Sequence, residues 1–171
     1  ENDDIGKGEW GSNTNNNVYK KPIKILSVRF KKKKKKLLNM GIECPKIYGD
    51  PLILLPLVYN LPVKQRYKIG VLPHYIDNNI QVTNMFVEKL QKKYTTLYID
   101  NIKCGKNFKP LINNIRKCEY LISSSLHGII MGIIYGKKTI FVTFSENVVG
   151  ENFKFYDFFE SININYDIPK Y

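Results

Sequence analysis

Residues that hold metals or form disulfides are scarce in this sequence. Its 171 residues include three cysteines and two histidines, and Cys44, Cys104 and Cys118 have no Cys or His within a few positions. Zinc sites usually draw on closely spaced pairs of such ligands, and unpaired cysteines are among the residues most often buried. The sequence therefore predicts no metal site and three reduced, buried thiols.

Long apolar runs are also missing. The longest, residues 52–61, contains Pro56 and Asn60 and is shorter than the ~18 residues that a membrane-spanning helix needs. A transmembrane segment is therefore not predicted. The chain begins at Glu1 with neither a methionine nor a signal-like apolar stretch, so we interpret it as a processed product or a fragment, for which a cytoplasmic location is favoured.

Positive charge, by contrast, is in excess. The formal net charge is +12, which favours an anionic partner such as nucleic acid, a membrane surface, a phosphorylated metabolite or an acidic glycan. Much of the excess comes from six consecutive lysines at residues 31–36. This run fits either a polyanion-binding patch or a solvated helix face. Aromatic residues do not interleave with it, so no nucleic-acid partner is expected.

The first part of the chain is irregular. Residues 1–22 are rich in Asn, Gly and charge, and we expect them to be flexible. Residues 23–62 are interpreted as the end of an amino-terminal lobe and a linker. In this segment, residues 23–28 form a β-type run, the lysines lead into a helix that ends at Gly41, and an apolar segment bracketed by prolines follows.

From residue 63 to residue 171 the pattern is more regular. Strands are predicted at residues 67–72, 95–99, 120–123 and 139–143, with helices at about residues 81–93, 110–116 and 126–135. This alternation predicts an α/β fold, with a parallel sheet and helices on both faces, in a Rossmann-like lobe. Right-handed crossovers then put every strand-to-helix loop at one edge of the sheet, where such folds bind ligands.

One of these loops carries Ser124 and Ser125, with His127 in the helix that follows. Hydroxyl side chains at a helix start either cap the helix or join its free amides in an anion site. An imidazole in the first helical turn can give or take a proton. The presence of His127 favours the second interpretation, a site for a phosphate or a carboxylate.

A second loop, residues 73–77, carries the other histidine, His74. Because both histidines fall at the same predicted edge, a shared site is favoured. Asp77 would orient an imidazole, act as a base or cap the next helix. Further upstream, Arg29 would either bind a carboxylate or phosphate bidentately or lie exposed without a ligand.

Five segments, taken together, resemble the polysaccharide pyruvyl transferase family. They are Ser27-Val28-Arg29, Tyr48-Gly49-Asp50-Pro51, residues 67–77, residues 122–128 and residues 152–158. The resemblance implies a two-lobed, GT-B-like architecture in which residues 63–171 form the carboxy-terminal, donor-binding lobe. It further implies phosphoenolpyruvate as the donor substrate, a glycan as the acceptor and no cofactor beyond the donor.

The resemblance also implies roles for individual residues. His127, His74 and Asp77 would be catalytic. The substrate-binding positions would be Arg29, Ser124, Ser125, Leu126 and Gly128. Two positions depart from the family pattern, because Phe30 stands where many relatives have glycine and Ser125 stands where some relatives have arginine.

Two other functions fit the same residues. A glycosyl or sialyl-type transferase of similar architecture would use a nucleotide-sugar donor in place of phosphoenolpyruvate. A non-catalytic module would hold an acidic glycan or nucleic acid on the basic helix and keep only a vestigial site. The glycosyltransferase differs from the pyruvyl transferase in the donor that it consumes. The non-catalytic module differs from both because it has no turnover.

Overall fold

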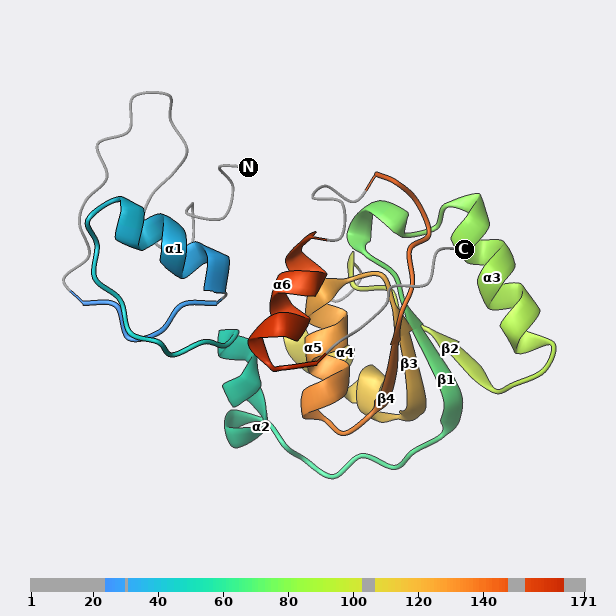
Figure 1. The fold of residues 1–171 in the computed structure, drawn as a ribbon. Helices are drawn as coiled ribbons and strands as arrows, with labels where there is room; N and C mark the ends of the chain where they lie inside the picture. Colours follow the sequence, from blue (N-terminus) through green and yellow to red (C-terminus); the bar gives the residue numbers. More distant parts are fainter. Residues whose placement is uncertain (1–23, 30, 103–106, 148–152, 165–171) are drawn as a thin grey trace. The chain divides into compact units, whose positions relative to one another are not determined.

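The computed structural model describes residues 24–29, 31–102, 107–147 and 153–164. These residues form two compact units (Figure 1). The first comprises the chain up to Asp50 together with Tyr156–Ile164, and the second contains Pro51–Phe155. The predicted flexible segment at residues 1–22 and the thiol of Cys104 lie outside the described residues.

The first unit is built around one short helix, α1 (Lys31–Asn39). Gly41 ends the helix with a φ of +71°, a left-handed conformation that glycine adopts without steric cost. The Ile42 N–H donates to the Leu37 carbonyl at 3.0 Å, a bond that spans the helix end and is typical of a glycine C-cap. The predicted helix and its glycine cap are therefore confirmed, and Val28, Leu37 and Ile42 pack beneath it.

The strand predicted at residues 23–28 is wrong for the residues that the structure describes. Val28 forms a single parallel bridge with Tyr48, through N–H···O bonds to Ile47 (3.0 Å) and from Gly49 (3.2 Å). Residues 24–27 form no ladder with a neighbouring strand, and Leu26 is 70% exposed. A β-type run becomes a strand only where a neighbouring strand pairs with it, and here the pairing stops after one residue.

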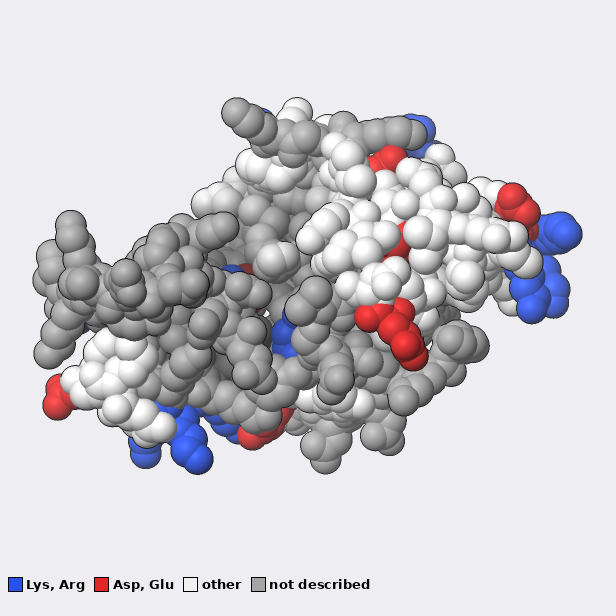
Figure 2. Space-filling model, turned by 90° about the horizontal axis from the view of Figure 1, so that it is seen from above, with Lys and Arg blue, Asp and Glu red and all other residues white. Residues whose placement is uncertain are grey.

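On the face shown in Figure 2, the basic side chains of the described residues gather in separate groups. One group belongs to the lysine helix α1, where Lys31 contacts Glu160 at 3.6 Å and Lys35 is exposed. Another lies at the end of helix α3 (Gln81–Gln91), where Lys89 and Lys92 are exposed. These two helices carry part of the positive charge, and other basic residues, such as Lys68 and Lys138, lie outside them.

The second unit contains a sheet of four parallel strands in the order β2-β1-β3-β4. The strands are β1 (Tyr67–Leu72), β2 (Thr96–Tyr98), β3 (Cys118–Ser123) and β4 (Lys138–Phe141). Helices α3, α4 (Phe108–Arg116) and α5 (Leu126–Ile134) connect them in turn. The predicted α/β fold with a parallel sheet is confirmed.

The helices cover both faces of this sheet (Figure 1). Successive side chains of a strand point to opposite faces, so Val71 packs with Val87 of α3, whereas Leu72 packs with Ile112 and Ile115 of α4. Across the sheet, the step from β1 to β2 runs in one direction and the step from β2 to β3 runs in the opposite direction. Right-handed crossovers therefore require α3 and α4 to lie on opposite faces, as they do.

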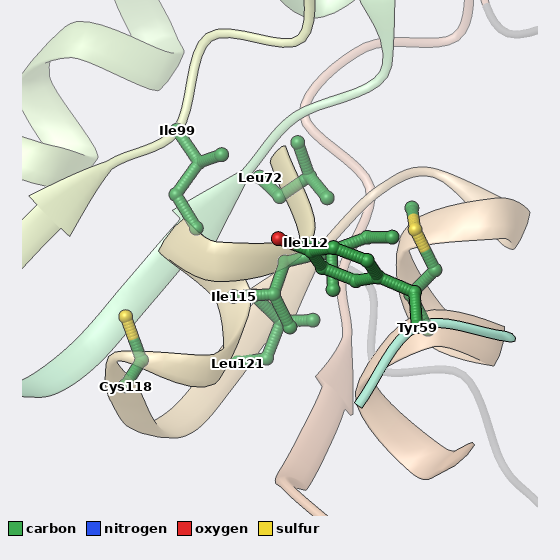
Figure 3. Packing of buried hydrophobic residues seen from close by; sticks show 8 residues of the cluster. Tyr59, Leu72, Ile99, Ile112, Ile115, Cys118 and Leu121 are labelled. Atoms are coloured by element: carbon green, nitrogen blue, oxygen red, sulfur yellow. The ribbon is translucent and has the colours of Figure 1, made fainter. Parts of the chain in front are cut away.

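The larger core cluster lies on the α4 and α5 face, where Leu72, Ile112, Leu121 and Tyr59 point toward one another (Figure 3). Apolar burial of this kind supplies most of the driving force for folding. Tyr59 is 8% exposed and also donates its hydroxyl to Asn113 Oδ1 at 3.1 Å. Its ring thus anchors the chain segment before β1 onto α4.

Three helical segments were not predicted from the sequence, and one of them is the short 3-10 helix η3 (Tyr75–Asp77) in the loop after β1. The apolar segment between prolines forms a 3-10 turn, η2 (Pro51–Leu54), and a single helical turn, α2 (Leu55–Val58). Nearer the end of the chain, the first turn of α6 (Phe153–Ser161) contains the buried Phe155, whose ring stacks on Phe141 with centroids 3.9 Å apart. Across the described ranges, every helix is too short or too polar to cross a membrane.

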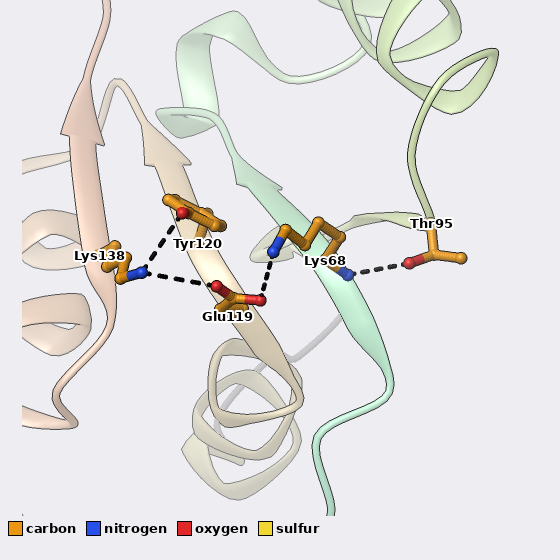
Figure 4. A network of polar contacts seen from close by, with 5 residues as sticks. All are labelled: Lys68, Thr95, Glu119, Tyr120 and Lys138. Carbon is orange, nitrogen blue, oxygen red and sulfur yellow. Dashed lines mark hydrogen bonds and ion pairs between the residues drawn. The ribbon is translucent and has the colours of Figure 1, made fainter.

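A surface network ties three strands together (Figure 4). Glu119 of β3 accepts a hydrogen bond from Lys68 Nζ of β1 at 2.7 Å and lies 3.6 Å from Lys138 Nζ of β4. The hydrogen bond from Lys68 lowers the pKa of Glu119. Both ammonium groups also lie about 5 Å from the ring centroid of Tyr120. Exposed ion pairs add little stability, so this network contributes little to the free energy of folding.

The buried thiol of Cys118 gives a chemical test of this core. Burial raises the pKa of Cys118 to about 11, so roughly one thiol in a thousand is ionised at pH 8. We expect Cys118 to resist iodoacetamide in the folded protein while the half-buried Cys44 reacts, as measured by peptide mass spectrometry. Both should react in denaturant, and equal labelling rates in the native state would contradict the burial of Cys118.

Candidate functional site

The strand order reverses between β1 and β3, because β2 lies beside β1 on one side and β4 lies beside β3 on the other. In open α/β sheets, ligands bind beyond the carboxyl ends of the strands at such a switch point. His74 follows β1 and His127 follows β3, and these two strands are direct neighbours. The prediction that the two histidines share one edge is therefore confirmed.

Serine side chains fix the start of α5 at this edge. Ser125 is the N-cap residue, and its Oγ accepts the N–H of Gly128 at 3.5 Å. Ser123 Oγ donates to the Leu72 carbonyl at 2.6 Å and accepts the N–H of Ser125 at 3.1 Å, which ties the end of β3 to the end of β1. The capping interpretation is thus confirmed for Ser125.

Steric constraints at α5 explain two further positions of the Leu126-His127-Gly128 segment. A Cβ on Gly128 would lie 2.3 Å from Ser123 Oγ and 2.9 Å from Leu72 Cδ2, distances too short for real contacts. Glycine is therefore required where α5 approaches the two strands. Leu126 is 6% exposed and belongs to the core, so contact of Leu126 with a substrate is limited to its backbone.

Asp77 lies at the centre of the hydrogen bonds that join the strand-end loops. Its side chain is fully buried and accepts hydrogen bonds from Ser124 Oγ at 2.8 Å and from Ser145 Oγ. Ser124 Oγ in turn accepts the N–H of His74 at 2.8 Å. The loops that follow β1, β3 and β4 therefore meet at one carboxylate.

The alternative in which Asp77 caps the next helix is wrong. The N-cap position of α3 is Ile80, which makes no side-chain capping bond. Thr83 of α3 instead donates its hydroxyl to the main-chain carbonyl of Asp77 at 2.9 Å. Asp77 therefore contacts α3 through its backbone and leaves its carboxylate for the serines.

The side chain of His74 is half-buried beside this carboxylate. Its Nδ1 accepts the N–H of Ile76 at 3.4 Å, so the neutral imidazole carries its proton on Nε2. Burial lowers the pKa of His74 below 6.5, Lys154 and His127 lower this pKa further, and the negative charge of Asp77 opposes the shift. Because the folded-state pKa is lowered, protonation of His74 at acidic pH opposes folding.

The end of β2 supports the loop that carries His74. Asn78 donates to Asp100 Oδ1 at 2.9 Å, and the Tyr98 hydroxyl is bonded both to Asn78 Oδ1 and to the N–H of Asn79. Asn79 has a φ of +61°, a left-handed conformation that asparagine tolerates better than most residues. These bonds hold the loop in one conformation while the exposed ring of Tyr75 packs against His74, with centroids 4.4 Å apart.

Other predicted site residues are placed as follows. His127 is exposed in the first turn of α5. Arg29 belongs to the first unit, where its Nε lies 3.0 Å from Oδ2 of the buried Asp50. The Arg29 and Tyr48-Gly49-Asp50-Pro51 segments are thus linked by an ion pair. No group of three His, Cys, Asp or Glu side chains within the described ranges is arranged to hold a metal ion.

Two residues of this edge were missed from the sequence. Lys154, at the start of α6, acts electrostatically on His74, and Ser145 bonds to Asp77 from the loop after β4. Ser145 had a usable signal, because it follows a predicted strand at the ligand-binding edge. Lys154 had none beyond its place in the segment 152–158, since α6 was not predicted.

The fold and these contacts define an α/β protein with titratable side chains gathered at the switch point of a parallel sheet. Residues 8–146 match the sequence profile of the family described as polysaccharide pyruvyl transferase, and the chain belongs to that family. It is also 30% identical over 122 residues to "Uncharacterized protein L143" of Acanthamoeba polyphaga mimivirus. That alignment covers 70% of this chain and 41% of the relative, so the chain spans less than half of that protein's length.

The close approach at Gly128 can be tested by stability. Gly128→Ala should lower the free energy of unfolding by about 1–3 kcal/mol, because Ser123 or Leu72 must move to admit the methyl group. Chemical denaturation measures the effect. Ile133→Ala, at an exposed position of the same helix, is the control and should cost less. A Gly128→Ala variant as stable as the parent would show that α5 does not pack this tightly.

Proposed function

We propose that the chain forms the donor-binding part of a polysaccharide pyruvyl transferase, which moves the pyruvyl group of phosphoenolpyruvate onto two hydroxyls of a glycan as a ketal. The observation that carries the proposal is the family match across both strand-end loops, which meet at the switch point. We also infer that residues 63–171 are the donor lobe of a two-lobed, GT-B-like protein.

The proposed reaction sets the requirements for the site. A proton adds to the methylene carbon of phosphoenolpyruvate, which makes the adjacent carbon electrophilic. A sugar hydroxyl adds to that carbon and loses its proton, and a second hydroxyl then displaces inorganic phosphate to close the ring. The products are the pyruvylated glycan and phosphate, so the site needs proton donors, proton acceptors and groups that neutralise the phosphate and the carboxylate.

The two histidines suit the proton transfers. We assign His127, exposed in the first turn of α5, as the donor of the proton to the methylene carbon. His74 is the better acceptor for the proton of the attacking hydroxyl, because its lowered pKa keeps the imidazole neutral near pH 7. Their placement beyond adjacent strands supports this pairing of roles.

Several groups would neutralise the anionic donor. The backbone amide of Leu126 lies in the first turn of α5, at the positive end of the helix dipole, whereas the Gly128 amide donates to the Ser125 cap. Lys154 adds a full positive charge close enough to influence His74. We further propose that Arg29 binds the donor, with its guanidinium held by the buried Asp50. The glycan hydroxyls would enter from the solvent side of the same edge.

The proton-donor role of His127 predicts a specific pattern of losses. His127→Asn should reduce pyruvyl transfer by about a hundred- to ten-thousand-fold, as expected for loss of general acid help, while phosphoenolpyruvate binding falls much less. Transfer of isotope from labelled phosphoenolpyruvate to glycan measures turnover, and calorimetry measures binding. Equal loss of both would make His127 an anion ligand. If the parent protein binds no phosphoenolpyruvate, the proposed function fails.

Lys154 can be tested with a charge-matched control. Lys154→Gln should weaken phosphoenolpyruvate binding by about ten- to a hundredfold, since a charged hydrogen bond or close ion pair of this kind contributes about 1.5–3 kcal/mol. Lys92→Gln removes the same charge from the exposed end of α3 and should leave affinity within about twofold. Calorimetry at physiological salt measures both variants. Equal effects would show that only overall charge matters.

A further inference from the structure

The hydroxyl groups of Ser124 and Ser145, which contact Asp77, each make two hydrogen bonds. Ser124 Oγ accepts the backbone N–H of His74 at 2.8 Å and lies 2.8 Å from Asp77 Oδ2. Ser145 Oγ accepts the backbone N–H of Asn147 at 3.2 Å and bonds to Asp77 Oδ1. A backbone N–H can only donate, so in each case the serine oxygen is the acceptor on that side.

The direction of the remaining hydrogen bonds follows from this. Each serine has one hydroxyl proton left, and each points it at a different oxygen of Asp77. Asp77 must therefore accept on both oxygens, which an ionised carboxylate does. A protonated carboxyl group, or an asparagine amide, would place its own hydrogen-bond donor against the hydroxyl proton of one of the two serines. Such an unsatisfied pair is costly in a site where Asp77 is fully buried.

We propose that Asp77 is a positioning residue, an ionised and buried carboxylate that accepts the Ser124 and Ser145 hydroxyl protons and thereby fixes the three strand-end loops of the donor site. In this role Asp77 neither donates nor takes a proton during turnover. Ser145 belongs to the same hydrogen-bond network and links the loop after β4 to Asp77. The importance of the network for donor turnover rests on the proposed function, whereas the hydrogen-bond directions do not.

The surroundings of His74 give a readout that a purely structural role of Asp77 would not change. His74 is faced by Lys154, His127, Asp77 and the ring of Tyr75, and Asp77 is the negative group among those that shift its pKa. A fixed charge at Asp77 therefore holds the titration midpoint of His74 higher than it would otherwise be. Removing the charge should lower that midpoint, whereas removing a serine hydroxyl should not.

Imidazole NMR of the full chain tests this directly, since the protein has two histidines to assign. We compare the parent with Asp77→Asn and with Ser145→Ala, which keeps the charge. The His74 midpoint should fall measurably in Asp77→Asn and stay near the parent value in Ser145→Ala. An unchanged midpoint in a folded Asp77→Asn variant would overturn the proposal, because Asp77 would then be uncharged in the parent.

The second arm measures function with phosphoenolpyruvate as the probe. Ser145→Ala should slow pyruvyl transfer by about tenfold or more because the loops lose their link, and Ser145→Thr, which keeps the hydroxyl, should restore most of the rate. The pH dependence of turnover should keep both of its limbs in Ser145→Ala. Equal rates for the alanine and threonine variants would overturn the role of Ser145 in the hydrogen-bond network.

The two arms separate the possible failures. A parent protein that does not bind phosphoenolpyruvate refutes the proposed function, while the NMR comparison still decides the charge of Asp77. If Asp77→Asn does not fold, backbone amide exchange of His74 in Ser124→Ala takes its place. Faster exchange of that amide than in the parent supports the bond from His74 to Ser124, and unchanged exchange contradicts it.

Discussion

The parallel pairing of β1 with β3 is the constraint on which the rest of the second unit depends. These strands are adjacent in the sheet although an entire β2 and two helices separate them in the chain. Their ladder runs from Tyr67 opposite Cys118 to Leu72 opposite Ser123, and Ser123 Oγ adds a bond to the Leu72 carbonyl at 2.6 Å. Both strand ends are thereby fixed in register, and so are the loops that start from them.

That register determines the chemistry available at the edge. Ser124 stands one residue beyond the end of β3, next to the loop after β1, so its hydroxyl reaches both the His74 amide and the Asp77 carboxylate. A shift of β3 by one residue would turn this hydroxyl to the other face of the sheet. Close packing of Gly128 against Ser123 and Leu72 resists such a shift, because no side chain fits between them. Core packing and site geometry therefore depend on the same few residues.

The net charge of +12 does not describe the electrostatics of the site, which depend on a few neighbouring charged groups. The lysines of α1 and of the α3 end are surface groups, whose electrostatic effect falls off within about 8 Å at physiological salt. At the switch point the relevant groups are few: the buried Asp77, the half-buried His74, the exposed His127, and Lys154. The opposed effects of Asp77 and Lys154 on His74 illustrate how a neutral imidazole can be kept beside both charges.

Much of the architecture could be predicted from the sequence, because alternation of apolar strands with amphipathic helices is a local pattern. The helices at residues 81–91 and 126–134 lie within about two residues of their predicted ends, and the common edge of His74 and His127 follows from parallel topology alone. The local sequence pattern did not predict the secondary structure correctly where strand pairing or tertiary packing determines it. Residues 24–28 look like a strand, but their one β-bridge joins Val28 to Tyr48. The proline-bracketed segment before β1 folds into helical turns, and its Leu52 and Leu55 pack against the core.

The candidate site shows the same division. The sequence by itself determined which side chains reach the carboxyl edge, namely His74, Asp77, Ser124, Ser125 and His127, since each follows a recognisable strand. Only the tertiary structure decided how they act on one another. In the structure, Ser125 caps α5, whereas Ser124 donates a hydrogen bond to the Asp77 carboxylate. The carboxylate of Asp77 is buried and does not face solvent. Ser145 and Lys154 lie at the same edge of the sheet. Hydrogen-bond partners far apart in the chain depend on strand order and register, and neither quantity is encoded in any single segment of the sequence.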